Sequence, residues 1–159
     1  MAQTKTYWED LEVGQTRELG HVTPTRESII AFATQFDPQP FHLDDEAAQA
    51  SMFGALCASG WHTCSMAMRL MVDHFLVDSS SLGSPGLEKI QWHQPVFPGD
   101  TLHLRMHIAE TRPMRSRPHV GMVRVVWDMS RQDGKKVLSM EGWSMFGRRN
   151  PAPPDKPAA

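Results

Sequence analysis

The amino-acid sequence predicts an α+β domain in which a long antiparallel β-sheet wraps around one buried α-helix. Between residues 60 and 76, apolar side chains recur around most of a helical wheel, which is typical of a helix buried in a core. In the second half the apolar period shortens to two, most regularly in residues 101–110, and this alternation indicates strands with one wet face. Asp133-Gly134 then separates two such segments, as the turn of a β-hairpin does.

Smaller elements are predicted ahead of the buried helix. A strand is expected near residues 16–22. Residues 26–36 carry apolar side chains at positions i, i+3, i+4 and i+7, and the hydroxyl side chains of residues 23–25 can cap a helix that begins there. A second, shorter helix is expected at residues 44–51, where two aspartates lie at the positive end of the helix dipole.

The buried helix and the strands that follow it are expected to supply most of the core. The apolar stripe of the helix should be buried; it consists of Trp61, Cys64, Met68, Met71 and Phe75, and it is broadened by Met66 and Leu70. Strands are expected at residues 87–94, 101–110, 119–130 and 135–147. Four long strands provide a sheet large enough to cover one face of the helix.

The composition limits the classes of function. A chain of 159 residues predicts one domain, assigned to residues 1–149, followed by a proline-rich flexible tail at residues 150–159. The net charge of −2 offers no electrostatic attraction for nucleic acid or an anionic membrane, and no apolar run approaches the roughly 18 residues that span a bilayer. The first residues lack the apolar stretch of a signal peptide, and only two cysteines occur, so we expect a cytoplasmic protein without disulfides.

The segment Asp37-Pro38-Gln39-Pro40-Phe41-His42 is the first candidate site. Its two prolines restrict the backbone and so hold an acid and a base at a constrained separation. An aspartate and a histidine that reach the same water could orient it, take its proton and return a proton to a substrate. The alternative is a structural loop, in which Asp37 caps a turn and His42 packs beside the core.

Ser59-Gly60, at the start of the buried helix, forms the second candidate site. The first N–H groups of a helix have no partner within the helix and carry a partial positive charge. Because Gly60 has no side chain, the oxygen of a thioester carbonyl could approach this backbone closely as negative charge develops on it. The alternative is again structural: Ser59 caps the helix and Gly60 permits a tight entry.

Other chemical interpretations of the sequence are weaker. Cys57, His62, Cys64 and His74 lack the spacing of a tetrahedral metal site, so we expect no metal. A serine nucleophile is not supported, because the GxSxG elbow is absent. The basic run at residues 112–117 is consistent with a site for the phosphates of a large substrate, or simply with a solvated loop.

Three motifs occur in the order found in one known family. Residues 37–42 match its hydratase motif, Asp-x-Asn-Pro-x-His, and Ser59-Gly60 match the small residue and glycine that open its central helix. Residues 95–102 match its Pro-Val-x-x-Gly-Asp-Thr-Leu element. On these residues the chain resembles the MaoC-like dehydratases and (R)-specific enoyl-CoA hydratases, which have the hot dog fold. The resemblance covers most of residues 7–147.

The resemblance implies a hydratase/dehydratase that adds water reversibly across a trans-2-enoyl thioester to give a 3-hydroxyacyl thioester. Asp37 and His42 would then activate the water, and the Gly60 N–H would bind the thioester oxygen. Gln39 stands where the motif usually has Asn, and its extra methylene group would change the substrate choice if the side chain supports Asp37 or lines the acyl channel. The residues expected to bind or shape the substrate are Gln39, Pro40, Ser59 and Trp61.

The resemblance also implies partners. The substrate would be an acyl-CoA or acyl-carrier thioester, with coenzyme A as part of the substrate and no separate cofactor. Edge-to-edge pairing of sheets would give a homodimer or a higher assembly of dimers. Because a fold does not determine a function, a hot dog acyl-CoA thioesterase and a non-catalytic acyl-binding subunit remain open as alternatives.

Overall fold

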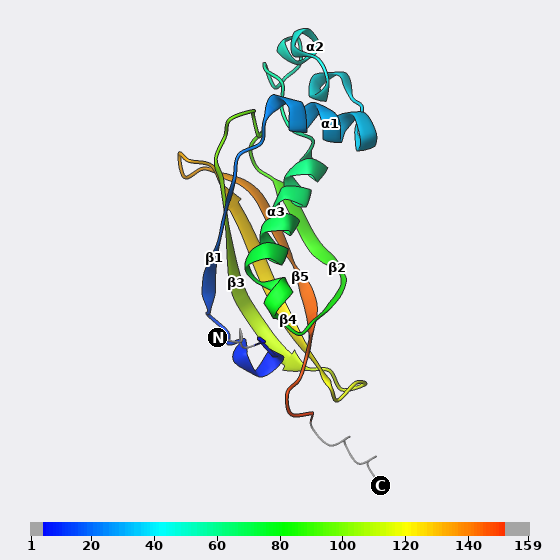
Figure 1. Cartoon of the computed structure of the whole chain (residues 1–159), viewed down its shortest axis with the longest axis vertical. Coiled ribbons are helices and arrows are strands. Elements are labelled where there is room, and N and C mark those ends of the chain that lie inside the picture. Colours follow the sequence, from blue (N-terminus) through cyan, green and yellow to red (C-terminus); the bar gives the residue numbers. More distant parts are fainter. Residues whose placement is uncertain (1–4, 152–159) are drawn as a thin grey trace.

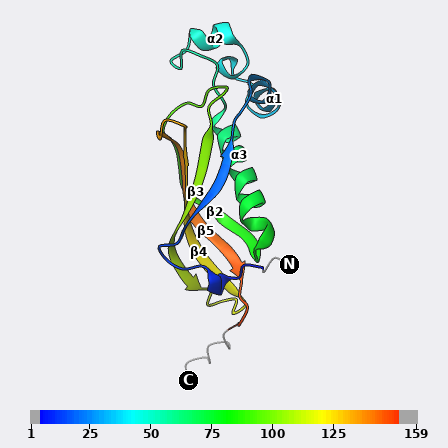
Figure 2. The same ribbon diagram turned by 60° about the vertical axis from the view of Figure 1, so that its left-hand side comes forward.

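In a computed structural model that describes residues 5–151, five antiparallel strands form one curved sheet (Figures 1 and 2). Their order across the sheet is β1-β3-β4-β5-β2. The strands are β1 (Thr16–Val22), β2 (Ser81–Trp92), β3 (Leu102–Pro113), β4 (Val120–Ser130) and β5 (Lys136–Gly147). The helices are α1 (Arg26–Phe36), α2 (Asp45–Gln49) and α3 (Gly60–His74), with short 3-10 turns η1 (Trp8–Asp10), η2 (Pro40–His42) and η3 (Leu76–Asp78).

The central helix α3 lies along one face of the sheet, as Figure 2 shows in side view. Helices α1 and α2 lie beyond the end of the sheet at which α3 begins (Figure 1). The predicted α+β arrangement of one long sheet around a central helix is therefore confirmed. Its consequence for function is that α1, η2 and the first turn of α3 come together at one end of the molecule.

The core lies between α3 and the sheet. On β3 the alternation expected from the sequence is present: Leu102, Leu104, Met106 and Ile108 are fully buried, and the residues between them are exposed. From α3, the apolar residues Met66, Ala67, Leu70 and Met71 face this sheet core. Burial of these side chains is the main force that holds α3 in place.

The prediction that the whole apolar stripe of α3 faces inward is wrong. Trp61 is 56% exposed and Met68 is 48% exposed, whereas Met71 and Phe75 are buried. The physical reason is that the sheet covers only one side of α3, so the part of the stripe nearest Trp61 and Met68 lies outside the contact. The helix also ends at His74 instead of residue 76, and the 3-10 turn η3 follows.

Strand β2 begins at Ser81 instead of the expected residue 87. Its first half contains Gly83, Pro85 and Gly86, which usually mark turns, and its pairing with β5 shifts register repeatedly along this stretch. The strand lies at an edge of the sheet, and every residue except Ile90 is exposed. An irregular strand of this kind leaves no clear alternation in the sequence.

The expected boundary between a domain at residues 1–149 and a tail at residues 150–159 stays a prediction, since residues 152–159 lie outside the described part of the chain. The predicted hairpin turn at Asp133-Gly134 is confirmed, with Gly134 at φ 80° between β4 and β5. Within residues 5–151, no helix is long and apolar enough to span a membrane.

Gly121 of β4 lies directly beneath the indole ring of Trp8, and a Cβ atom at position 121 would overlap that ring. The ring is held there by a hydrogen bond from its Nε1 to the carbonyl oxygen of Met122, 3.2 Å away. We expect Gly121→Ala to lower the free energy of unfolding by about 1 to 3 kcal/mol, because the added methyl group forces the indole outward. Urea unfolding of this variant, and of the same substitution in a Trp8→Ala background, checks the cause. An equal loss in both backgrounds would contradict it.

Candidate active site

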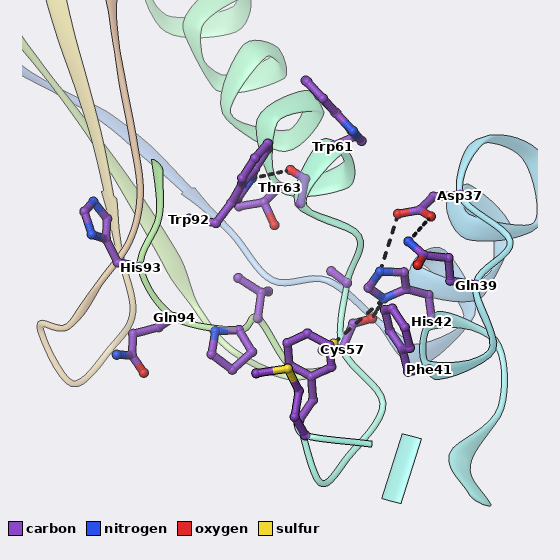
Figure 3. A pocket seen from close by; sticks show the side chains of 16 residues that line it. Asp37, Gln39, Phe41, His42, Cys57, Trp61, Thr63, Trp92, His93 and Gln94 are labelled. Atoms are coloured by element: carbon purple, nitrogen blue, oxygen red, sulfur yellow. Dashed lines mark hydrogen bonds and ion pairs between the residues drawn. The ribbon is translucent and has the colours of Figure 1, made fainter. Parts of the chain in front are cut away.

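A cavity of about 620 Å³ lies where η2 meets the first turn of α3 (Figure 3). It brings together residues from four separate segments of the chain: the loop after α1, the segment before α3, α3 itself and the end of β2. The site residues predicted from the sequence that line it are Asp37, Gln39, His42, Gly60 and Trp61. The candidate acid–base pair and the candidate oxyanion donor therefore face one space.

Asp37 ends helix α1 and accepts hydrogen bonds on both carboxylate oxygens. The Ser59 hydroxyl donates to Oδ2 at 2.7 Å, and the Gln39 amide donates to Oδ1 at 2.7 Å. Partial burial alone would raise the pKa of Asp37, but these two hydrogen bonds and the nearby His42 ring outweigh it and hold the pKa below its ordinary value. Asp37 is therefore a carboxylate at neutral pH.

His42 is buried, and its orientation is determined by the backbone. Its Nδ1 lies 2.7 Å from the carbonyl oxygen of Cys57, which can only accept, so Nδ1 carries the hydrogen. In the neutral ring Nε2 is then an acceptor, and it lies 3.4 Å from Asp37 Oδ2. Two acceptors thus lie side by side at the cavity wall (Figure 3).

The loop between the two side chains is short and internally bonded. The Gln39 N–H donates to the carbonyl of Asp37 at 2.8 Å, and the His42 N–H donates to the carbonyl of Gln39 at 3.0 Å. Pro40 occupies the first position of η2, where its missing N–H costs no hydrogen bond. These contacts give Asp37 and His42 a defined separation, as expected from the two prolines.

Gly60, the first residue of α3, lines the same cavity. Ser59 caps the helix, and its hydroxyl oxygen accepts the Trp61 N–H at 3.3 Å. Within the described residues, no acceptor bonds the Gly60 N–H. On the other side of Gly60, the Trp92 indole Nε1 donates to the Gly60 carbonyl at 2.9 Å. The Gly60 N–H is therefore free to bind a ligand, whereas the Gly60 carbonyl is held by the Trp92 indole.

Two of the predicted substrate-binding residues are absent from the cavity wall. Pro40 is exposed on the outside of η2, and Ser59 is fully buried with its hydroxyl directed at Asp37. The hydroxyl bonds the carboxylate and not the His42 ring, so a Ser–His nucleophile is not formed. The basic run at residues 112–117 lies around the β3–β4 hairpin, at the end of the sheet far from α1 (Figure 1).

Sequence reasoning missed two contributions to this site. The carbonyl of Cys57 selects the His42 tautomer, and a backbone carbonyl leaves no signature in a sequence. The second is Trp92, whose bond to the Gly60 carbonyl links the end of β2 to the start of α3 and depends on tertiary packing between distant segments. Pocket walls also come from Met52 and Phe53 in the loop after α2.

The cysteines near the site are not activated. Burial raises the pKa of the Cys57 thiol to about 11, so it is protonated at neutral pH. Among residues 5–151, no group of three or more His, Cys, Asp or Glu side chains is arranged to hold a metal ion.

His62, on the first turn of α3, is buried against α1. Its ring stacks on Phe32 with the ring centroids 4.7 Å apart, and its Nδ1 has no hydrogen-bond partner among the described residues. Burial lowers the pKa of His62 below its ordinary value of 6.5, because a charged ring would lose its hydration there.

Acid should therefore weaken the fold through His62. Above pH 6.5 the residue is neutral in both states; below that pH the unfolded chain binds the proton more readily, and stability falls until the lower pKa of the folded state is reached. The slope in this window is at most about 1.4 kcal/mol per pH unit. His62→Phe should reduce the loss between about pH 7 and about pH 5 in urea unfolding, whereas His107→Gln on the exposed side of β3 should not. Identical losses in both variants would contradict this assignment.

Comparison with known proteins agrees with the geometry of the site. Residues 10–128 match the family described as MaoC like domain. The chain belongs to this family. A MaoC-like dehydratase from Rhodospirillum rubrum is 38% identical, with 91% of this chain and 98% of that chain covered and a TM-score of 0.84.

Two further relatives help to place the MaoC-like chain. The 3-hydroxybutyryl-CoA dehydratase of Methylorubrum extorquens is 27% identical over 139 residues, which cover 84% of this chain and 83% of the relative. A Mycobacterium tuberculosis protein with a double hotdog fold is 19% identical, with 98% of this chain and 47% of that chain covered and a TM-score of 0.71. The fold is therefore the hot dog fold expected from the sequence motifs.

Proposed function

We propose that this MaoC-like protein is an acyl-thioester hydratase/dehydratase that adds water reversibly to a trans-2-enoyl thioester. One observation carries the proposal: His42 Nε2 and Asp37 Oδ2 are two acceptors 3.4 Å apart, and they share a cavity with the Gly60 N–H. The family membership supports the same reaction class.

The acceptor pair explains how water would be bound and activated. A water molecule donates one hydrogen to each acceptor, which leaves an oxygen lone pair free to attack C3 of the enoyl group. As the O–C3 bond forms, one O–H bond breaks and its proton passes to His42 Nε2. Because its pKa is held low, Asp37 remains a carboxylate and stabilises the charged imidazole beside it.

The Gly60 N–H, at the start of α3, would stabilise the negative charge that develops during this attack. The electron pair of the C2=C3 bond moves toward the thioester carbonyl, and the Gly60 N–H stabilises the oxygen on which negative charge collects. The proton on His42 then passes to C2, on the face from which the water came. Dehydration is the same sequence in reverse.

The substrate class is inferred from the relatives and from the cavity. One relative is a 3-hydroxybutyryl-CoA dehydratase, and the cavity here is lined largely by apolar side chains around the acceptor pair. We infer an acyl-CoA or acyl-carrier thioester as substrate, with coenzyme A only as part of that substrate and no further cofactor.

We also infer a homodimer formed through β2. Among residues 5–151 no strand pairs with the outer edge of β2, and large apolar side chains are exposed along it and on the adjoining side of α3. These side chains are Leu82, Leu87, Trp92 and Met68. Pairing of two β2 edges would cover them and remove the open edge.

A thioesterase and a non-catalytic acyl-binding subunit are the alternatives to distinguish. The test incubates the protein with crotonyl-CoA and follows both the loss of conjugated absorbance and the release of free thiol. We expect absorbance to fall without thiol release. Thiol release would favour the thioesterase, and tight binding without turnover across a panel of enoyl thioesters would favour the binding subunit.

A further inference from the structure

The space between α3 and β2 contains two successive cavities. The first is the catalytic cavity, whose walls include Gly60 and Trp61 on α3 and Trp92 on β2. The second, which we call the α3–β2 groove, has a volume of about 480 Å³ and a mainly apolar lining. It is lined by Cys64, Met68, Met71, Leu76, Leu87, Trp127 and Met140 together with small residues of β2 and β5. The same helix and strand therefore lead from one cavity to the other.

Trp92 lies at the junction of the two cavities. Its indole Nε1 donates to the carbonyl of Gly60 at 2.9 Å, and the side chain of Cys64, four positions further along α3, already lines the groove. The ring packs closely enough on Gly60 that a Cβ atom there would lie 2.7 Å from Nε1. Trp61 meets the Trp92 ring edge-on, with centroids 5.3 Å apart (Figure 3). The indole therefore bridges β2 and the first turn of α3.

A thioester in the catalytic cavity has two arms, and they need different exits. The coenzyme arm is large and polar and must reach solvent, which it can do on the side of Met52, a residue that is 93% exposed. The acyl arm is apolar, and beyond the catalytic cavity the next mainly apolar space along α3 is the α3–β2 groove. Because the groove lies further along the same helix and strand, an acyl chain that extends toward it from the catalytic cavity passes Trp92.

We propose that Trp92 is a specificity-determining residue that separates the catalytic cavity from the α3–β2 groove and so restricts the substrate to short acyl chains. This inference rests on the proposed hydratase function. A crotonyl group fits beside the acceptor pair without reaching the groove. Longer chains meet the indole ring, which is held by its bond to Gly60.

The test measures kcat/KM for crotonyl-CoA and for 2-decenoyl-CoA with the parent protein, Trp92→Ala and Trp143→Phe. Trp143 lies on β5 outside both cavities and serves as the matched aromatic control. We expect the parent to prefer crotonyl-CoA, and the decenoyl-to-crotonyl ratio to rise about tenfold or more in Trp92→Ala only. If Trp92→Ala acted only by disturbing Gly60, kcat/KM would fall equally for both substrates and the ratio would not change.

Two further measurements separate the inference from the proposed function. Met68→Trp added to Trp92→Ala should refill the groove and reverse the gain. Calorimetry measures the binding of butyryl-CoA and decanoyl-CoA without any turnover. If the protein hydrates no enoyl thioester but Trp92→Ala binds decanoyl-CoA more tightly than the parent does, the proposed reaction is refuted and the role of Trp92 in chain-length selection is supported. A parent that accepts or binds both chain lengths equally, an unchanged ratio in Trp92→Ala, or no binding of either thioester would overturn the inference.

Discussion

Removal of either member of the acceptor pair should nearly abolish hydration. We expect Asp37→Asn and His42→Ala each to lower kcat for crotonyl-CoA by about 10²- to 10⁴-fold, the range lost with a positioned acid–base group. Asp37→Asn replaces an acceptor by an amide and removes the charge that stabilises the His42 ring. His42→Ala removes the Nε2 atom that lies 3.4 Å from Asp37. The loss of conjugated absorbance measures both rates.

Controls for these two variants come from the same residue types elsewhere. Asp73→Asn breaks an ion pair with Arg69 on the exposed side of α3, and His107→Ala removes an exposed ring from β3. Neither should change kcat appreciably. Hydration at the parent rate by both Asp37→Asn and His42→Ala would exclude the acceptor pair as the catalytic group.

The parts of the fold that the sequence predicts are those with one buried face. On β3 the alternation of buried and exposed residues is regular, because one side of the strand faces α3 and the other faces solvent. On β2 nearly every residue is exposed and the register shifts, so the period of two is lost at Gly83 and Gly86. Helix α3 is intermediate between β3 and β2 in this respect. Its apolar stripe is wider than the part of its surface that contacts the sheet, and the sequence alone does not define which apolar residues lie outside that contact.

The candidate site was predictable in its chemistry but not in its supports. Asp37 and His42 are five positions apart in a loop restrained by prolines, so their proximity follows from local sequence. The groups that orient them come from distant segments: Ser59 bonds Asp37 across 22 positions, and the Cys57 carbonyl bonds His42 across 15. Tertiary packing creates these contacts. Gln39 is a different case: it lies only two positions from Asp37, and its amide donates to the carboxylate within the same loop.

Gly60→Ala should separate activity from stability. We expect kcat for crotonyl-CoA to fall by about 10²- to 10³-fold, the loss found when an oxyanion donor is removed, because the new methyl group crowds the approach to the Gly60 N–H. It also meets Trp92, whose Cε2 and Nε1 would both lie 2.7 Å from the added Cβ. Because Gly60 is the first residue of α3, the preference of a helix for alanine contributes at most about 1 kcal/mol and offsets only part of the strain against Trp92, so urea unfolding should show a small loss of stability.

The double variant Gly60→Ala/Trp92→Ala identifies which contact lowers the rate. If the loss arises because the methyl group blocks the N–H, it persists when the indole is removed, and this is the result we expect. Any strain between the methyl group and the indole is relieved in the double variant, so its free energy of unfolding should not fall further than that of Trp92→Ala alone. Full hydration activity in Gly60→Ala would rule out the Gly60 N–H as the oxyanion donor. Recovery of activity in the double variant would show instead that Gly60→Ala lowers the rate by displacing the Trp92 ring. Because both variants keep Asp37 and His42, the experiment tests the charge-stabilising half of the site independently of the water-activating half.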